Sequence, residues 1–195
     1  MTYIEFQKIV KRIFDIILAL ILIALFSIPM LVVAVLIKLM SKGPAIFWTD
    51  RVGVNNTIFK MAKFRTMKLN TPQVATHLMR NPKQYLIPWG GEMRKYSLDE
   101  LPQLFNVLKG EMSFVGPRPA LFNQDDLVKL RTKKNIHSLI PGLTGWAQVN
   151  GRDDLSIPVK VSFDEYYLNH LSFAFDLYII LLSVFKAIRK EGVQH

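Results

Sequence analysis

The stretch IILALILIALFSIPMLVVAVLI, from Ile16 to Ile37, contains no charged residue and decides the fold of this chain. As one straight α-helix it would be roughly 33 Å long, enough to cross the hydrocarbon core of a bilayer. Pro29 lies in its second half, where it removes a backbone donor and crowds the preceding turn. Ser27 can bond a carbonyl that a bend exposes, so these residues predict a membrane helix with a break.

Basic residues flank both ends of this segment: Lys8, Lys11, Arg12, Lys38 and Lys42. Because positive flanks favour the cytoplasmic side, a re-entrant hairpin that returns to the same face explains both ends and the proline. A kinked helix that crosses the membrane is the open alternative. We expect residues 1–42 to form the re-entrant helix-break-helix and residues 43–195 to form one cytoplasmic domain.

The rest of the chain predicts a small, α-rich α/β domain. Residues 45–49 have the character of a strand that leads into a turn at residues 53–56, and residues 58–67 are expected to form a strand or a hairpin. Apolar residues at helical spacing indicate a short helix at residues 101–108 that ends at Gly110. Further helices are expected at residues 125–134, 154–170 and 173–190. The last of these could lie in a membrane interface or form a core helix.

Composition restricts the possible functions. The chain has 195 residues, a formal net charge of +10 and no cysteine. Thiolate metal sites and cysteine nucleophiles are therefore excluded, and the four scattered histidines have no spacing typical of metal ligands. Basic charge beside an apolar segment favours anionic lipids or phosphorylated small molecules as partners. Nucleic acid is not expected, because it would leave that segment unexplained.

Asp99 and Glu100 stand at the start of the predicted helix at residues 101–108. A helix start favours anions, and two carboxylates beside many cations could bind magnesium and supply a nucleophile. The structural alternative is a capping box, in which Ser97 and Glu100 only cap the helix. Pro102 leaves the capping frame open, so both interpretations stand.

Other residues could bind phosphate. Arg118 lies between two prolines that restrict its backbone, which suits rigid presentation of a guanidinium group. The stretch from Pro141 to Arg152 contains three glycines and can approach a ligand closely. Lys60 and Lys63 lie in a basic region that could contact phosphate or simply face solvent or lipid.

These residues occur in motifs that resemble the monotopic phosphoglycosyl transferases, a bacterial sugar transferase family. The resemblance covers nearly the whole chain, in this order: Lys11 to Asp15, the membrane segment, Arg51 to Gly53, Lys63 to Met67, Ser97 to Leu101, Phe114 to Pro119, and Pro141 to Arg152. The motifs are weak one by one, but their shared order is specific. One departure is the spacing Ser27-Ile28-Pro29, where the family commonly has adjacent Ser-Pro.

The resemblance implies an enzyme that moves a sugar-1-phosphate from a UDP-sugar to undecaprenyl or another polyprenyl phosphate. Asp99 would attack the sugar-bearing phosphorus, release UMP and hold a covalent phosphosugar. Glu100 would bind Mg²⁺ together with Asp99 or take a proton from the acceptor. Phosphate or nucleotide contacts are implied for Arg94, Arg118, Arg152, Lys60 and Lys63. Asp164 and Asp176 match acidic family positions and are expected to pair with basic residues.

The resemblance also places the protein at the bacterial inner membrane, among phospholipids, with its catalytic domain on the cytoplasmic face. It matches the minimal catalytic form, without the extra N-terminal membrane domain of larger relatives. Two other functions stay open: a non-catalytic basic membrane scaffold, and a hydrolase that uses the same carboxylates with water as acceptor.

Overall fold

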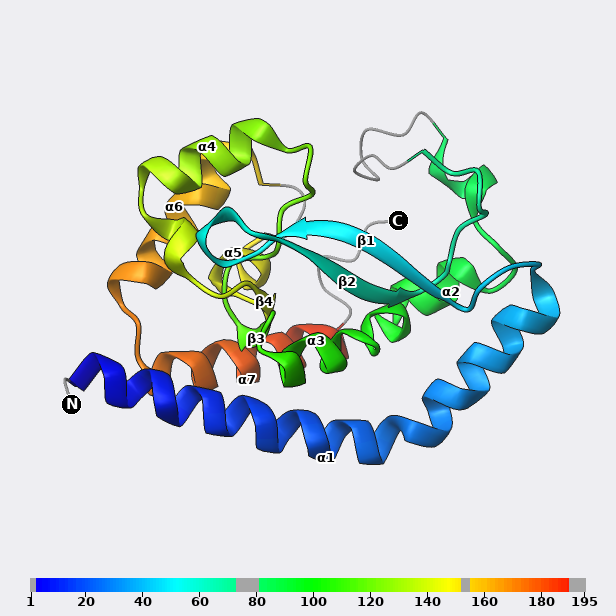
Figure 1. Ribbon diagram of the computed structural model, residues 1–195, viewed down its shortest axis with the longest axis horizontal. Helices are drawn as coiled ribbons and strands as arrows, with labels where there is room; N and C mark the ends of the chain where they lie inside the picture. The colour runs from blue at the N-terminus through cyan, green and yellow to red at the C-terminus, as the bar shows by residue number, and fades with distance from the viewer. Residues whose placement is uncertain (1–2, 73–80, 152–154, 190–195) are drawn as a thin grey trace.

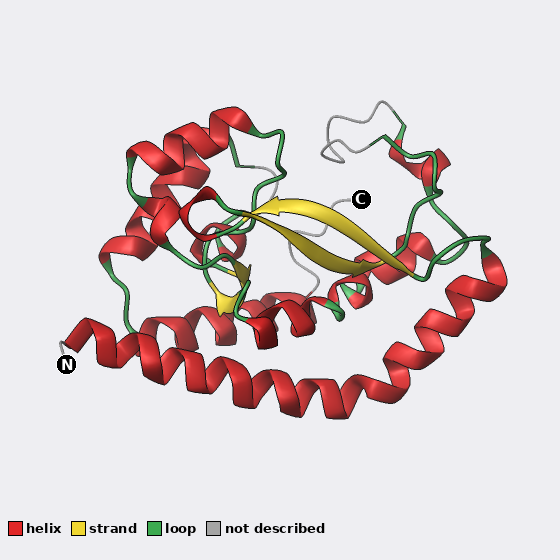
Figure 2. Ribbon diagram, in the orientation of Figure 1, coloured by secondary structure: helices red, strands yellow, loops and turns green. Residues whose placement is uncertain are grey.

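The computed structural model describes residues 3–72, 81–151 and 155–189. It confirms a mixed α/β fold in which helix predominates (Figure 2). The helices are α1 (Tyr3–Met40), α2 (Gly90–Lys95), α3 (Gln103–Lys109), α4 (Asp125–Lys133), α5 (Trp146–Val149), α6 (Ile157–Asn169) and α7 (Phe173–Arg189). The strands are β1 (Ile46–Val52), β2 (Ile58–Phe64), β3 (Ser113–Val115) and β4 (Gly142–Thr144). Short 3₁₀ turns join them, among them η1 (Val54–Asn56), η3 (Pro82–Tyr85), η4 (Leu98–Glu100) and η5 (Ile136–Ser138).

Helix α1 runs along one side of the molecule and bends as it turns toward β1 (Figure 1). The expected break is a bend and not an interruption, because the helix continues through Pro29. Ser27 donates its hydroxyl to the carbonyl of Ala24 at 2.9 Å, one turn earlier, as predicted for a serine near a bend. Residues Gln7–Met40 are long and apolar enough to cross a membrane. Together these observations give one bent membrane-type helix in place of two separate ones.

Strands β1 and β2 form the predicted hairpin, with Asp50 opposite Lys60 in an antiparallel register. The turn between them contains η1, where Asn55 and Asn56 adopt a left-handed backbone. Asparagine tolerates that conformation better than most residues. In Figure 1 the hairpin lies across the middle of the molecule, above α3 and α1.

The main core lies between α1, α3, the parallel pair β3 and β4, and α7. Ala19, Val107 and Ile179 are fully buried there and come from three of these helices. A second core surrounds Ile37, which packs with residues of β2 and α2. Both halves of α1 are therefore bound to the same domain.

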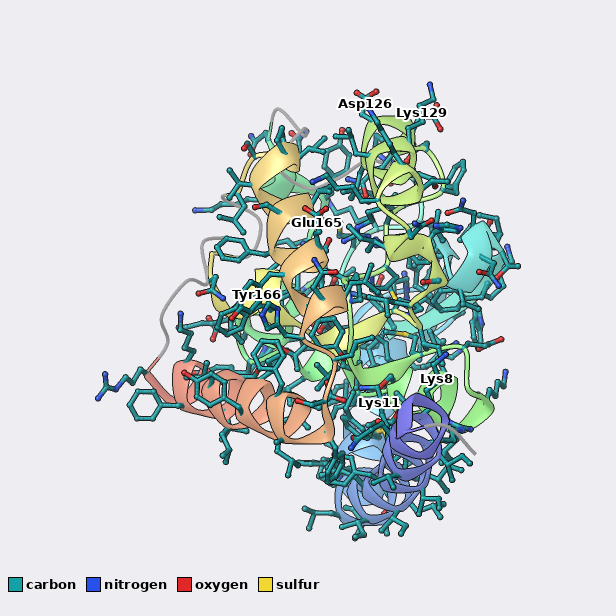
Figure 3. All side chains as sticks on the ribbon, turned by 90° about the vertical axis from the view of Figure 1, so that its left-hand side faces the viewer. Lys8, Lys11, Asp126, Lys129, Glu165 and Tyr166 are labelled. Atoms are coloured by element: carbon teal, nitrogen blue, oxygen red, sulfur yellow. The ribbon has the colours of Figure 1, made fainter. Side chains whose placement is uncertain are left out.

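Helix α7 packs beside α1, and Figure 3 shows the two at the base of the molecule. Ile179 faces the core, whereas the other side of α7 exposes apolar side chains: Leu177, Tyr178, Leu181, Val184 and Phe185. Lys11 of α1 bonds Asp176 of α7 at 2.6 Å and the carbonyl of Val115 at 2.9 Å. The Tyr167 hydroxyl donates to the same Asp176 carboxylate at 2.6 Å. The expectation that Asp176 pairs with a basic residue is confirmed.

Candidate active site

Asp99 and Glu100 lie on η4, between α2 and α3, at the point where the chain turns toward the main core. The capping box is not formed: Ser97 has a left-handed backbone, and in the described part of the chain its side chain caps no amide. The α3 helix instead begins after Pro102, which is suited to a first helical turn. The Glu100 carboxylate is therefore available for other partners.

Lys63 of β2 lies between the two carboxylates. Its ammonium nitrogen is 2.8 Å from Oε1 of Glu100 and 3.7 Å from Oδ2 of Asp99. Arg118 also contacts Glu100, with Nη2 at 3.0 Å from the same Oε1. Lys63 and Arg118, which are far apart in the sequence, thus meet at the pair of carboxylates on η4.

The two carboxylates have opposite electrostatic environments. Burial raises the pKa of Asp99, although the positive charges of Lys63, Arg94 and Arg118 oppose this effect. Burial also acts on Glu100, but the charges and hydrogen bonds of Lys63 and Arg118 lower its pKa below the ordinary value. Glu100 is consequently a fixed anion, whereas Asp99 is a buried carboxyl with a raised free energy in its charged form. Such a division between neighbouring carboxyl groups is typical of catalytic pairs.

Arg118 is held by its backbone as well as by Glu100. Arg131 of α4 donates to the carbonyl of Arg118 at 2.8 Å, and its guanidinium group pairs with the buried Asp164 at 2.7 Å. The expected basic partner of Asp164 is thereby confirmed. A Cβ added at Gly116 would lie 2.3 Å from the carbonyl oxygen of Ile140, so only glycine fits where this segment passes the chain that enters β4.

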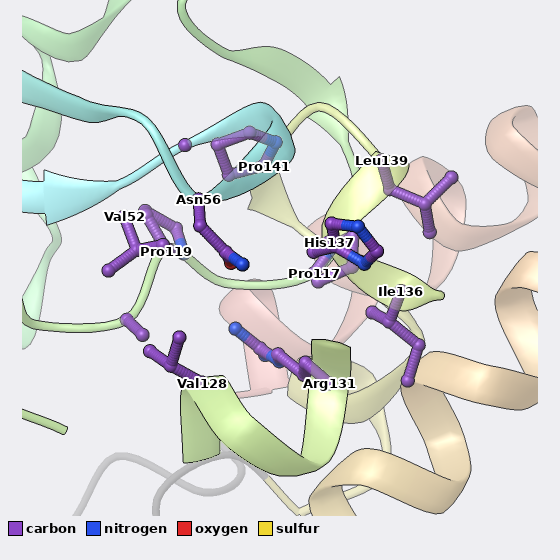
Figure 4. Close-up of a pocket in the computed structure, with 12 residues that line it drawn as sticks. Val52, Asn56, Pro117, Pro119, Val128, Arg131, Ile136, His137, Leu139 and Pro141 are labelled. Atoms are coloured by element: carbon purple, nitrogen blue, oxygen red, sulfur yellow. The ribbon is translucent and has the colours of Figure 1, made fainter. Parts of the chain in front are cut away.

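Figure 4 shows a small cavity that Arg131 and His137 line together with Pro117 and Pro119. Its volume is about 30 Å³, so it has room for only a very small group such as water. A cavity of this size is too small for a nucleotide-sugar.

The remaining predicted site residues do not all gather here. Arg94 of α2 acts electrostatically on Asp99 and places Nη1 3.6 Å from the sulfur of Met67. Lys60 lies on the exposed side of the hairpin, where its ammonium nitrogen pairs with Asp50 at 2.8 Å. It sits three positions from Lys63, and side chains alternate between the faces of a strand. Arg152 lies outside the described residues.

Sequence reasoning missed the residues that hold the segment from Phe114 to Arg118. Lys11 reaches the carbonyl of Val115, Asp15 accepts the amide of Phe114 at 3.1 Å, and Arg131 reaches Arg118. Lys11 and Asp15 belong to a motif noted in the sequence, but nothing local indicated their partners on β3.

The oxygen atoms at η4 could take part in a metal site. Within residues 3–72, 81–151 and 155–189, no cluster of three or more His, Asp or Glu side chains could hold an ion. Asp99 and Glu100 nevertheless supply hard carboxylate oxygens from adjacent residues. Mg²⁺ is often bound by one or two carboxylates, with water and substrate phosphates completing its shell. The pair therefore fits a magnesium ion that arrives with a phosphorylated substrate.

Comparison with known sequences decides the family. The profile described as bacterial sugar transferase matches residues 6–190, nearly the whole chain. The chain belongs to the bacterial sugar transferase family. The predicted transferase class is confirmed by this match.

Individual relatives with similar sequences are also named as sugar transferases or sugar-phosphate transferases. The chain is 41% identical over 186 residues to the UDP-N-acetylgalactosamine-undecaprenyl-phosphate N-acetylgalactosaminephosphotransferase of Aeromonas hydrophila, covering 92% of this chain and 43% of that protein. It is 38% identical over 188 residues to the UDP-glucose:undecaprenyl-phosphate glucose-1-phosphate transferase of Escherichia coli (strain K12), covering 92% and 40%. An uncharacterized sugar transferase, EpsL of Bacillus subtilis (strain 168), is 39% identical over 188 residues, covering 95% and 91%. The chain thus spans about two fifths of the first two relatives and nearly all of the third.

Proposed function

We propose that this protein transfers a sugar-1-phosphate from a UDP-sugar to undecaprenyl phosphate, and so begins the assembly of a glycoconjugate. The names of the Aeromonas and Escherichia relatives describe this reaction type for those proteins. The observation that carries the proposal is the site itself: Asp99 is only 7% exposed, adjoins the fixed anion Glu100, and has Lys63 3.7 Å from its oxygen. A buried carboxylate among cations suits attack on a phosphorus.

The proposed reaction has two displacements at one phosphorus atom. An oxygen of Asp99 bonds to the sugar-bearing phosphorus, the bond from that phosphorus to the bridging oxygen breaks, and UMP leaves with the electron pair. An oxygen of the lipid phosphate then attacks the same phosphorus. The bond to Asp99 breaks, which restores the carboxylate and gives a polyprenyl diphosphate sugar.

The surrounding cations counter the repulsion between anions. Lys63 and Arg118, which contact Glu100, would bind the diphosphate oxygens, and Arg94 adds positive charge to the site. Magnesium, held by Asp99 and Glu100, would neutralise further charge on the diphosphate. Glu100, held by its two cationic partners, keeps these side chains positioned.

We further propose that α1 is re-entrant in the inner membrane and that the domain faces the cytoplasm. At one end of α1, Lys11 pairs with Asp176 of α7. At the other end, Arg65 of the domain donates to the Ser41 carbonyl at 2.9 Å and to the Pro44 carbonyl at 2.8 Å. Because both ends bind the same small domain, they belong on the same side of a bilayer. The exposed apolar side of α7 would then rest among phospholipids.

The central experiment compares wild type with Asp99→Asn in lipid nanodiscs, using a panel of UDP-sugars, magnesium and undecaprenyl phosphate. We expect UMP release that depends on the acceptor, and a phosphosugar adduct detected by intact-protein mass, both lost in the variant. Asp50→Asn, at an exposed carboxylate on β1, is the matched control. UMP release without the acceptor would indicate a hydrolase. No release from any UDP-sugar by the folded protein would indicate a scaffold.

Topology has its own test, because the chain contains no cysteine. Cysteines introduced by Lys8→Cys and Lys42→Cys should both be protected in intact spheroplasts from a membrane-impermeant maleimide and labelled after lysis. Labelling of one position alone in intact spheroplasts would show that the helix crosses the membrane.

A further inference from the structure

A groove opens beside the carboxylate pair, between α1 and α3. Its volume is about 220 Å³. Leu22 and Phe26 of α1 form one wall, Leu104 and Leu143 lie among the residues that form the rest, and Glu100 contributes a polar group. A ligand that matches this groove would combine an apolar part with a charged end.

The α1 wall is distinct from the side of α1 that is exposed. Leu22 and Phe26 are four residues apart and share one face of the helix. Ile21 and Leu25 lie on a neighbouring face and are 56% and 66% exposed, which suits contact with lipid chains. The groove therefore lies on the domain side of a membrane-type helix, between that helix and Glu100.

We propose that this groove binds the isoprene units nearest the phosphate of the polyprenyl acceptor. The inference rests on the proposed function and adds the place where the lipid chain lies. The acceptor phosphate must reach the phosphorus carried by Asp99, and the attached hydrocarbon needs an apolar path from there toward the bilayer. The lining residues connect Glu100 with α1 and provide that path.

The size of the groove limits how much of the chain it holds. A cavity of about 150 Å³ with similar walls is large enough to bind benzene. A groove of about 220 Å³ therefore accommodates a few carbon–carbon bonds more, which corresponds to the first isoprene units and not a whole undecaprenyl chain. The remainder of the chain would stay among the lipids around α1.

The test separates the two half-reactions. Leu22→Trp fills the groove from α1, and Leu25→Trp makes the same change on the exposed face of the same helix. In nanodiscs, we expect Leu22→Trp to lower kcat/KM for undecaprenyl phosphate by about tenfold or more. Adduct formation from the UDP-sugar without acceptor should stay within about twofold of wild type. Leu25→Trp should leave both half-reactions unchanged.

A second measurement uses the unaltered protein and is independent of how the variant folds. Acceptors with one, two and three isoprene units, namely dimethylallyl, geranyl and farnesyl phosphate, should give kcat/KM values that rise steeply and then level off as the groove fills. In Leu22→Trp the rise should be lost.

Three results would overturn the inference. The first is equal acceptor efficiency in the two tryptophan variants, and the second is an equal loss of adduct formation and acceptor turnover in Leu22→Trp. The third is acceptor efficiency that does not depend on the first isoprene units. A wild-type protein that forms neither adduct nor UMP would instead refute the proposed function, and the inference with it.

Discussion

Removal of one hydroxyl group from the buried cluster between α1, α6 and α7 tests how the domain holds its membrane helix. Tyr167 is 2% exposed, and its hydroxyl donates to Asp176 at 2.6 Å. Burial and the nearby Asp176 carboxylate raise the pKa of Tyr167, so the phenol stays a hydrogen-bond donor at neutral pH. Tyr167→Phe keeps the ring and removes this bond, together with two longer contacts of 3.4 Å that join the hydroxyl to the Val115 carbonyl and to the Lys11 ammonium group.

The expected loss in the free energy of unfolding depends on the partners that Asp176 keeps. A hydrogen bond to a charged group contributes about 1.5–3 kcal/mol, and Asp176 would still be paired with Lys11 at 2.6 Å. Lys11→Met should cost more, about 3–5 kcal/mol, because it leaves the Asp176 charge buried without its cation. At about 2–4 °C per kcal/mol, Tyr167→Phe should lower Tm by about 3–12 °C.

The assay is thermal unfolding in nanodiscs, with Tyr178→Phe as the matched control because Tyr178 is 50% exposed. Tyr178→Phe should leave Tm within about 1–2 °C of wild type. Equal Tm values for the two tyrosine variants would refute the reasoning. So would a larger loss of stability in Tyr167→Phe than in Lys11→Met.

Three further predictions concern the active site and its surroundings. Gly116→Ala should reduce the free energy of unfolding by at least about 1–3 kcal/mol, because its Cβ would lie 2.3 Å from the carbonyl of Ile140; urea unfolding would detect this loss. Lys60→Ala removes a side chain that is 66% exposed and paired with Asp50, so turnover should stay within about twofold; a tenfold loss would place Lys60 in the site. Burial raises the pKa of Asp99, so the folded state carries a cost for its charge that appears as pH rises through the raised pKa. Asp99→Asn should therefore be inactive yet more stable than wild type at pH 7, with the difference shrinking below about pH 4, as Tm measurements at both pH values would show.

Local patterns predicted the longer elements of the cytoplasmic part of this fold, but not the short elements α2, α5, β3 and β4. The hairpin of β1 and β2, the end of α3 at Gly110 and the extents of α4 and α7 follow from alternation, helical spacing and a left-handed glycine. A bend near Pro29 was also expected, but the structure has a continuous bent helix where the sequence predicted a break. A helix that loses one backbone hydrogen bond can continue when the neighbouring turns support it.

The candidate site was harder to predict, since it depends on contacts between distant segments. Whether Glu100 caps a helix or joins the charged site depends on Lys63, 37 residues away, and on Arg118. Lys60 and Lys63 looked equivalent in a basic region, and only the strand register separates them. The groove beside Glu100 is formed by residues of α1, α3 and β4 together, so no single segment of the sequence predicts it.

The ion pair between Lys11 and Asp176 joins residues that are 165 positions apart, and this separation affects how the chain folds during synthesis. At about 5–20 residues per second, the ribosome needs roughly 8–33 s after making Lys11 to produce its partner. During that time the apolar helix α1 exists without the domain that covers its inner face. Such a long interval favours early insertion of α1 into the bilayer, with the rest of the chain folding onto a helix already held by lipid. Closure at this late stage makes the docking of α7 onto α1 a late step of folding. A nascent chain truncated before α7 would be bound to the membrane without this contact.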